Sequence, residues 1–284
     1  MTKKETRIHK KMKSQKKNLS RRVKKKTIKK PYKKTKMVGS GKKCMCIDYT
    51  LEKGKMSLNH NTHGHKCQNE VAPGQDFCPK HKSCLKFIQK FVSGNEPSYQ
   101  PDAWNNTQEI KGSHNCYNYF LNSHIKPVKE KCRQLKIAGE TKSKKCSKLK
   151  PQPGDFDQLV KYGTLKFKNR DYTCTAMEKK VLNDNPSIKK SSYTRKCPRG
   201  SYKGALVVDP YNTYHFYRQN PDGKWSHKPG TLNVTDKDAS EQYIYFPHLA
   251  DRNYKKDKDK GINYTDFCGY FCIPRNSKVN LNAI

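Results

Sequence analysis

The pattern of hydrophobic and polar residues changes along the chain and marks four segments. Residues 1–43 contain few large apolar residues and show neither a helical nor a strand period. Residues 44–92 are rich in cysteine and histidine. They end in the run LKFIQKFV (85–92), whose apolar residues near helical spacing predict a short amphipathic helix. Residues 93–103 are rich in Gly, Pro, Ser and Asn and are expected to form a linker. Residues 104–284 have the pattern of a globular domain.

Within the globular segment, helical patterns come first and strand patterns follow. Residues 115–122 (NCYNYFLN) predict the start of a helix, and residues 156–190 carry mixed helical signals. Strands are predicted for the short apolar or aromatic runs at 205–208, 214–218, 224–227, 243–246 and 268–273. The turn Asn220–Gly223 joins two of these runs, and its Asp-Gly step is typical of a β-hairpin. Helices followed by antiparallel strands predict an α+β fold.

Positive charge is concentrated near the start of the sequence. The chain has 61 Lys and Arg against 24 Asp and Glu, a formal net charge of +37, and residues 1–43 hold 20 of these cations with a single acidic residue, Glu5. Such a segment cannot bury enough apolar surface to offset the entropy cost of ordering, so we expect a disordered arm. A dense cationic arm binds polyanions by counterion release, which predicts nucleic acid or another polyanion as partner. An anionic membrane surface and a nuclear-import signal at Lys24–Lys30 are the alternatives.

The sequence has no pattern typical of a membrane span or a secretion signal. No window approaches the run of about 18 apolar residues that a span requires, and the basic start lacks an apolar signal-peptide stretch. We therefore expect an intracellular protein that is not secreted. In a reducing compartment, zinc ligation or free thiols are expected for most of the twelve cysteines, rather than a disulfide framework. In an oxidised particle, Cys268 and Cys272 are candidates to pair with a cysteine such as Cys174 or Cys197, and spacing alone does not settle which cysteines join.

Cysteine and histidine spacing in residues 44–92 predicts a small zinc-type module. Cys78 and His81 form a close pair, and a tetrahedral zinc site commonly takes two such pairs on separate turns. The predicted ligands are Cys46, Cys67, Cys78 and His81, with Cys44 as the alternative to Cys46. Further candidates in the segment are His60, His63, His65 and Cys84. A segment this polar has little core of its own, so the zinc is expected to be structural and to supply folding energy.

The same segment resembles a short motif found in proteins of nucleocytoplasmic large DNA viruses. That motif is a Cys, then Gly-x-x-Cys-(Lys/Gln)-Asn, then Phe/Tyr-Cys-x-x-His, and the runs GHKCQN and FCPKH are similar to it. The matching residues are Gly64, Cys67, Asn69, Phe77, Cys78 and His81. The gap from Cys46 to Cys67 is longer than in that pattern. The resemblance implies a viral protein of the host cytoplasm or nucleus, packaged in the virion in one interpretation.

Cys116 has the sequence context of a cysteine nucleophile. A thiol is activated at a helix N-terminus beside a histidine, and Gly112–Asn115 can cap the helix that Cys116 begins. His215, in the middle of a predicted strand, is the candidate base. His227 on the neighbouring hairpin strand would orient it, with Asp209 as the alternative orienting residue. The competing interpretation is that Cys116 is a buried core residue, because cysteine is among the most buried residue types.

This order of residues resembles the papain-like fold in its NlpC and CHAP branches, which are cysteine peptidases and amidases. The run HNCYNYFLN is similar to their nucleophile helix, PQPGD to the turn before their sheet, and residues 204–230 to their base hairpin. The resemblance covers residues 112–273, with a longer segment between Pro153 and Ala205 than in compact members. It implies catalysis by Cys116 as nucleophile, His215 as base and His227 as orienting residue, on a peptide substrate.

The sequence therefore leaves two candidate functions of different classes. The first is a cysteine hydrolase, a peptidase or amidase, that the basic arm tethers to a polyanion. The second is a non-catalytic nucleic-acid-binding or structural virion protein. A hydrolase requires the thiol of Cys116 in an accessible cleft within hydrogen-bond reach of His215. A structural protein requires only the fold and the arm.

Overall fold

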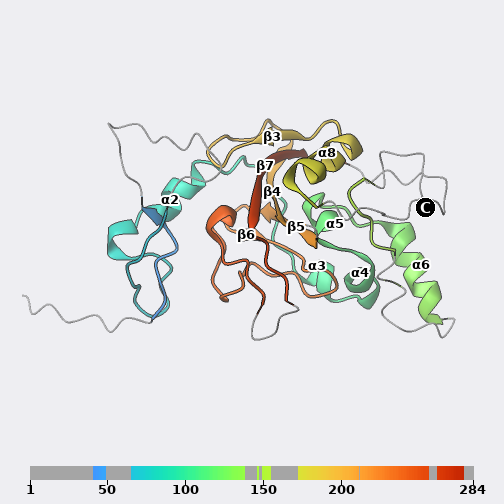
Figure 1. The fold of residues 1–284 in the computed structure, drawn as a ribbon, viewed down its shortest axis with the longest axis horizontal. Coiled ribbons are helices and arrows are strands. Elements are labelled where there is room, and N and C mark those ends of the chain that lie inside the picture. Colours follow the sequence, from blue (N-terminus) through green and yellow to red (C-terminus); the bar gives the residue numbers. More distant parts are fainter. Residues whose placement is uncertain are drawn as a thin grey trace, which may run out of the picture. The chain divides into compact units, whose positions relative to one another are not determined.

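A five-stranded antiparallel sheet lies at the centre of the fold (Figure 1). The computed structural model describes residues 41–48, 65–137, 146, 149–154, 172–210, 212–255 and 261–277. Residues 1–40 of the predicted arm and residues 155–171 of the mixed helical segment therefore lie outside the described residues. Residues 39–284 form one compact unit.

The sheet has the strand order β3-β7-β4-β5-β6 and includes the predicted hairpin. Its strands are β3 (Lys189–Ser191), β4 (Ser201–Asp209), β5 (Thr213–Gln219), β6 (Trp225–Ser226) and β7 (Asp266–Pro274). In the hairpin, Arg218 of β5 lies opposite Ser226 of β6, and Gly223 in the turn has a φ of 86°. This positive φ costs glycine nothing, which explains the Asp-Gly step. The α+β fold class and four of the five predicted strands are confirmed.

The predicted strand at 243–246 is wrong. In this segment only isolated bridges form, between Tyr243 and Lys237 and between Ile244 and Trp225, and a 3-10 helix, η3 (Pro247–Leu249), follows at once. Pro247 has no backbone N–H to donate to a ladder, so the strand cannot continue. Conversely, β3 was not predicted, because Lys189 and Lys190 are exposed and this edge strand lacks an apolar pattern.

Short helices precede the sheet, as the sequence predicts. They are α2 (Cys84–Gln89), α3 (Asp102–Asn105), α4 (Gln108–Ser113), α5 (Cys116–Phe120), α6 (Lys126–Ile137) and α8 (Cys174–Asp184). Helix α2 matches the predicted amphipathic helix and α5 the predicted helix start. At the start of α5 the side chain of Asn115 accepts hydrogen bonds from the N–H groups of Tyr117 and Asn118, which is a capping box. Among the described helices, none combines the length and apolar character that crossing a bilayer requires.

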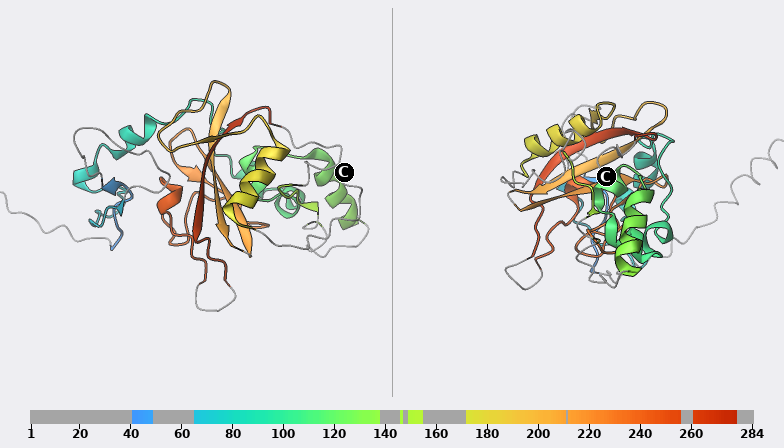
Figure 2. Two further views of the ribbon diagram at one scale, coloured as in Figure 1. Left: turned by 45° about the horizontal axis from the view of Figure 1, so that its top comes forward. Right: turned by 90° about the vertical axis from the view of Figure 1, so that its right-hand side faces the viewer.

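One face of the sheet is covered by helices. Helix α5 packs on β5 and helix α8 lies along β7 and β4 (Figure 2). The cluster between them contains Cys116, Tyr117 and Phe120 of α5, Met177 and Val181 of α8, and the sheet residues Leu206, Val208, Tyr214, Phe216 and Phe271. The approach is close: a Cβ added at Gly204 would lie 2.3 Å from the ring of Phe120. Glycine at 204 therefore allows α5 to contact β4.

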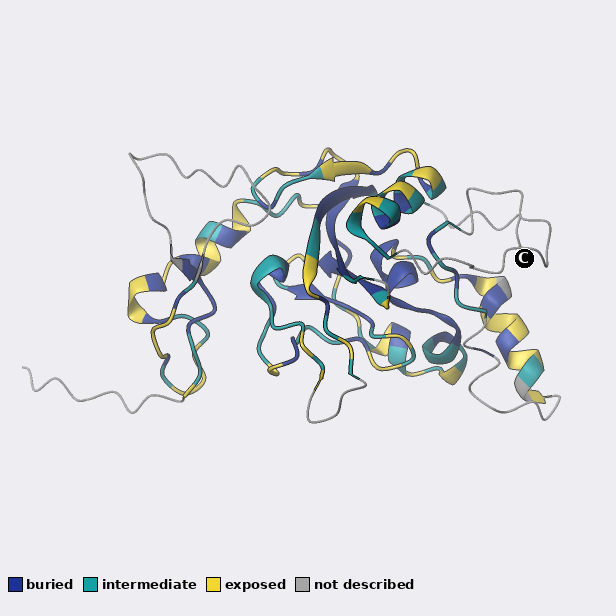
Figure 3. Cartoon of the chain, in the orientation of Figure 1, coloured by how far each residue is buried: buried dark blue, intermediate teal, exposed yellow. Residues whose placement is uncertain are grey.

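The opposite face of the sheet is also buried (Figure 3). Its residues Ala205, Val207 and Tyr217 share one hydrophobic cluster with Cys44, Cys67 and Cys78 of the Cys/His-rich segment and with the loops at 244–254. Two side-chain hydrogen bonds connect the same parts, from the Lys66 ammonium to Gln242 Oε1 at 2.8 Å and from the Tyr245 hydroxyl to Asp76 Oδ2 at 3.0 Å. The Cys/His-rich segment thus packs against the sheet.

Four disulfides correct the expectation that most cysteines are free or bind zinc. They are Cys46–Cys84, Cys132–Cys146, Cys174–Cys268 and Cys197–Cys272, which use eight of the twelve cysteines. Two of them join β7 to distant segments: Cys268 lies where the register of β7 shifts against β4, and Cys272 lies opposite Lys189. Sheet register sets these proximities, and spacing along the sequence does not reveal it.

Candidate metal centre

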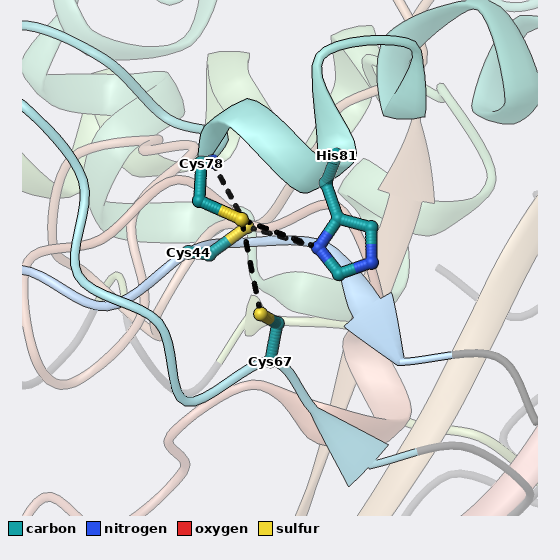
Figure 4. A group of neighbouring side chains, drawn as sticks. All are labelled: Cys44, Cys67, Cys78 and His81. Atoms are coloured by element: carbon teal, nitrogen blue, oxygen red, sulfur yellow. Dashed lines mark hydrogen bonds between the residues drawn. The ribbon is translucent and has the colours of Figure 1, made fainter. Parts of the chain in front are cut away.

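The four cysteines that form no disulfide include three that meet one histidine. Cys44, Cys67, Cys78 and His81 converge from three separate segments (Figure 4). Strands β1 (Ile47–Asp48) and β2 (His65–Lys66) pair antiparallel, which brings the residue stretches beside them together. The N–H of Cys67 donates to the carbonyl of Cys46 at 2.9 Å, and the N–H of Cys44 donates to the carbonyl of Asn69 at 2.8 Å. Cys44 and Cys67 are therefore held next to each other by backbone hydrogen bonds.

The other two residues of the group come from one tight turn. Cys78 is the N-cap of the 3-10 helix η1 (Pro79–His81), and the N–H of His81 donates to the carbonyl of Cys78 at 2.8 Å. Pro79 fits the first helical position, where a missing N–H costs nothing. This knuckle turns the side chain of His81 back onto the sulfur of Cys78.

The distances between the four side chains suit a tetrahedral metal ion. The donor atoms all lie within 4.8 Å of one another. His81 Nδ1 is 3.6 Å from Cys44 Sγ and 3.5 Å from Cys78 Sγ, and the sulfurs of Cys67 and Cys78 are 4.0 Å apart. A tetrahedron with Zn–S bonds of about 2.3 Å and a Zn–N bond of about 2.0 Å has S···S edges of about 3.8 Å and S···N edges of about 3.5 Å. The three cysteines and the histidine thus have both the donor chemistry and the spacing of a zinc site.

Burial disfavours the charged thiolate forms of the three cysteines unless a cation is present. All four residues are buried. Burial raises the pKa of the Cys67 thiol to about 11 and also raises that of Cys44. Burial acts in the same direction on Cys78, but the hydrogen bonds that its sulfur accepts outweigh it and lower the pKa. A bound dication would supply the charge that three buried thiolates require.

Asn69 supports two members of the group at once. Its side-chain amide donates to the sulfur of Cys78 at 3.7 Å, and its backbone carbonyl accepts the N–H of Cys44. The N–H of Cys78 in turn donates to Cys44 Sγ at 3.2 Å. Hydrogen bonds of this kind orient metal ligands. They give Asn69 a structural role beside the sulfurs of Cys44 and Cys78.

Of the predicted metal ligands, Cys67, Cys78 and His81 come together and Cys46 does not. Cys46 forms a disulfide with Cys84, and Cys44, the alternative in the sequence, takes the fourth position. The backbone bends at Met45 and Cys46 before β1 begins, so the side chains of Cys44 and Cys46 do not point the same way. Among the other candidates, His65 lies in β2, whereas His60 and His63 lie outside the described residues.

Cys116 lies at the capped N-terminus of α5, where the sequence predicts it, but it is buried. Its side chain belongs to the cluster with Phe216, and burial raises the pKa of its thiol to about 11. Neighbouring strand residues point to opposite faces of a sheet. His215 accordingly points away from the α5 face and stacks on Tyr264, with ring centroids 5.3 Å apart. The structure therefore does not bring Cys116 and His215 together as a dyad.

His215 and His227 do meet, as the sequence predicts. Nε2 of His215 lies 2.8 Å from Nδ1 of His227, and Nε2 of His227 lies 2.8 Å from the carbonyl of Lys237. Because a carbonyl only accepts, His227 donates from Nε2, and its Nδ1 accepts from His215. Burial lowers the pKa of His227 to about 4 and that of His215 well below its usual value. Asp209, the alternative orienting residue, instead accepts the N–H of Asn263 at 3.1 Å.

Comparison with known proteins adds one partial similarity. No described protein family and no solved structure matches the chain. Insoluble matrix shell protein 1 of Ruditapes philippinarum is 38% identical to it over 76 residues. The match covers 27% of this chain and 45% of that protein, so less than half of the relative is represented. This chain is thus similar, over about a quarter of its length, to a protein named for the insoluble matrix of a shell.

Proposed function

We propose that this chain is a non-catalytic structural protein that is held together by a zinc ion and binds nucleic acid through its basic arm. The observation that carries the proposal is the buried group of Cys44, Cys67, Cys78 and His81. Four protein ligands close a tetrahedral site, which is typical of structural zinc, whereas catalytic zinc keeps one position open. Thiolate-rich donor sets favour zinc or iron over magnesium or calcium.

The role of the metal is to join segments that have little core of their own. In the zinc-bound protein, Cys44 and Cys67 hold the β1 and β2 segments, while Cys78 and His81 hold the knuckle at η1. The cluster that contains the three cysteines continues into the sheet residues Ala205 and Val207. The bound ion thus supports packing of this segment on the sheet, and no reaction is assigned to it.

The nucleic-acid partner rests on charge. Residues 1–43 hold 20 Lys and Arg against one acidic residue. Neutralising phosphates with such side chains releases counterions, which favours binding without sequence preference. The name of the curated relative, a shell matrix protein, supports a structural role. The viral Cys/His motif supports a particle protein of this kind, with the arm on the packaged genome.

The salt dependence of binding tests the arm. The slope of log K against log salt for a DNA duplex is expected to be strongly negative for the full chain. Replacing Lys24, Lys25 and Lys26 with Gln should make it less steep by about 3, at about 0.9 per lost phosphate contact. The matched control replaces three exposed lysines of α6, Lys126, Lys129 and Lys131, with Gln. Salt-independent binding, or no binding, would refute the nucleic-acid role.

A cysteine hydrolase is the second candidate, and one observation favours it. The hydrogen bond from His215 to the anchored His227 has the arrangement of a base with its orienting residue. Activity would require the N-terminus of α5 to move so that Cys116 reaches His215. Alkylation of the thiols across pH, in wild type and in His215→Ala, tests this candidate. Fast reaction of Cys116 below pH 7 that slows in the variant would support the hydrolase. An ordinary thiol profile in both proteins would exclude it.

A further inference from the structure

A second concentration of positive charge lies on the folded part of the chain. We propose that this surface, the basic edge (Lys189, Arg195, Lys196, Arg199 and Arg275), is a preformed binding site for the phosphate backbone of nucleic acid. It lies where β3 and β7 form one edge of the sheet (Figure 1). The inference rests on the proposed nucleic-acid role and adds to the arm a site with fixed geometry.

The members of the basic edge are held together by the sheet and by a disulfide. Lys189 of β3 lies opposite Cys272 of β7, and Cys272 is bonded to Cys197. Arg195, Lys196 and Arg199 flank Cys197 in one short loop. The N–H of Arg275 donates to the carbonyl of Gly200 at 2.8 Å, which ties the end of β7 to the same loop.

The residues of the basic edge are exposed to solvent, and none of them pairs with an acidic residue in the part of the chain that the structure describes. All five side chains belong to exposed residues. Residues 185–208 contain no acidic residue. Over the described part of the chain, the five cations make no ion pair; the Lys189 ammonium donates to the carbonyl of Pro186 at 3.0 Å. Five like charges at one edge repel one another and attract a polyanion.

Two acidic side chains of neighbouring segments already have other partners. Glu178 pairs with Lys190, with Nζ and Oε2 2.6 Å apart. Glu96 is buried and accepts the N–H groups of Ser93 and Gly94 at 2.6 and 2.7 Å. Lys203, buried beneath the loop, donates to the carbonyls of Phe91 and Tyr193. The surface above these residues therefore keeps its positive charge.

Phosphate is the chemistry that this edge fits. Three of its five cations are arginines, whose planar guanidinium groups pair with phosphate through two parallel hydrogen bonds. The disulfide and the backbone bond at Gly200 keep the loop ordered before binding, which lowers the entropy cost of association. A repeating phosphate chain can neutralise several of these charges at once.

The test compares two triple variants of the full chain on a DNA duplex. Changing Arg195, Arg199 and Arg275 to Gln should make the salt slope less steep by about 2 to 3, with roughly tenfold or greater weakening at moderate salt. Changing Lys126, Lys129 and Lys131 of α6 to Gln removes the same charge from an exposed helix and should alter the slope by less than about 1. Far-UV circular dichroism and intact mass check that each variant is folded and keeps its disulfides.

A third variant separates geometry from charge. Changing the same three arginines to Lys keeps the charge, so the salt slope should stay near wild type while affinity falls, because paired guanidinium contacts are lost. If the wild-type chain does not bind DNA, the proposed function fails. If the arm variant weakens binding but the Gln variant of the basic edge behaves like the α6 control, only the present inference is wrong. Displacement of DNA by polyglutamate as readily as by polyphosphate would also overturn it.

Discussion

At the scale of residues, the chemistry of the chain depends on which cysteines are buried next to which partners. Cys116 and Cys78 are both buried thiols, yet only Cys78 lies beside a histidine and two further sulfurs. The thiol of Cys116 has a pKa of about 11 because burial disfavours its charged form. The two cysteines therefore form a matched pair for experiments.

Removing one ligand should abolish zinc retention. We expect about one zinc ion per chain in the wild-type protein and much less in Cys78→Ser, because three remaining ligands leave the site open to water. Cys116→Ser should keep the ion. Elemental analysis of purified protein, after dialysis against a weak chelator, measures the difference. Equal zinc content in the two variants would show that the metal binds elsewhere.

The buried histidine pair predicts loss of stability in acid. The pKa of His227 is lowered to about 4, and that of His215 is lowered as well, below the value of about 6.5 in an unfolded chain. As the pH falls below about 6.5, the unfolded state binds more protons at these two histidines than the folded state does. The stability that the neutral pair contributes is therefore fully present above that pH and is lost toward pH 4.

Urea unfolding at pH 7 and pH 5 measures this effect. The double variant His215→Gln, His227→Gln should lose less stability between the two pH values than the wild-type protein. The comparison between proteins matters because acid also protonates the ligands of the metal centre in both of them. An equal loss in both proteins would rule out the histidine pair as a source of the pH dependence.

At the scale of elements, glycine positions determine how closely helices approach the sheet. A Cβ at Gly204 of β4 would lie 2.3 Å from the ring of Phe120 and 2.5 Å from the side chain of Ile273. Neither neighbour has free space to move into, because both belong to the cluster under α5. The contact between α5 and β4 therefore depends on a missing side chain.

Gly204→Ala should destabilise the protein by roughly 1–3 kcal/mol, because overpacking forces side chains off their rotamers. The control is Gly112→Ala in helix α4, where the one contact of the added Cβ within the described residues is with Cys146 Cβ, at 3.6 Å. That change should be neutral or stabilise by about 0.5–1 kcal/mol, because alanine favours helix interiors. Denaturant midpoints compare the two variants. Equal stability of both would mean that α5 does not pack as described.

At the scale of the whole molecule, the metal centre and the sheet share one hydrophobic cluster. Cys44, Cys67 and Cys78 belong to it together with Val207, Tyr217 and Trp225. A ligand that binds only the folded state stabilises the entire cooperative unit. Zinc should therefore affect the unfolding of the sheet as well as that of the Cys/His-rich segment.

Chelation is expected to lower the melting temperature of the main calorimetric transition. Tryptophan fluorescence can follow the same step, because Trp225 lies in the shared cluster. The Cys78→Ser variant, already without metal, should melt at a lower temperature and respond little to the chelator. A separate low-temperature transition that leaves the main one unchanged would show that the Cys/His-rich segment unfolds independently of the sheet.

The sequence by itself determined the local features. The apolar or aromatic runs at 205–208 and 214–218, the Asp-Gly turn and the capping residues before Cys116 are short-range patterns, and the corresponding strands, hairpin and helix are present. The close pair Cys78 and His81 is local in the same sense, because one turn of 3-10 helix sets its geometry. The charge of the arm is also a property of composition alone.

Only the tertiary structure decided which distant residues meet. It selected Cys44 over Cys46 through a bend before β1, paired Cys268 and Cys272 of β7 with distant cysteines, and put His215 on the sheet face away from Cys116. It also gathered the basic edge from three segments. The physical reason is that a one-residue change of register reverses the face of every side chain in a strand, and spacing along the sequence does not record that choice.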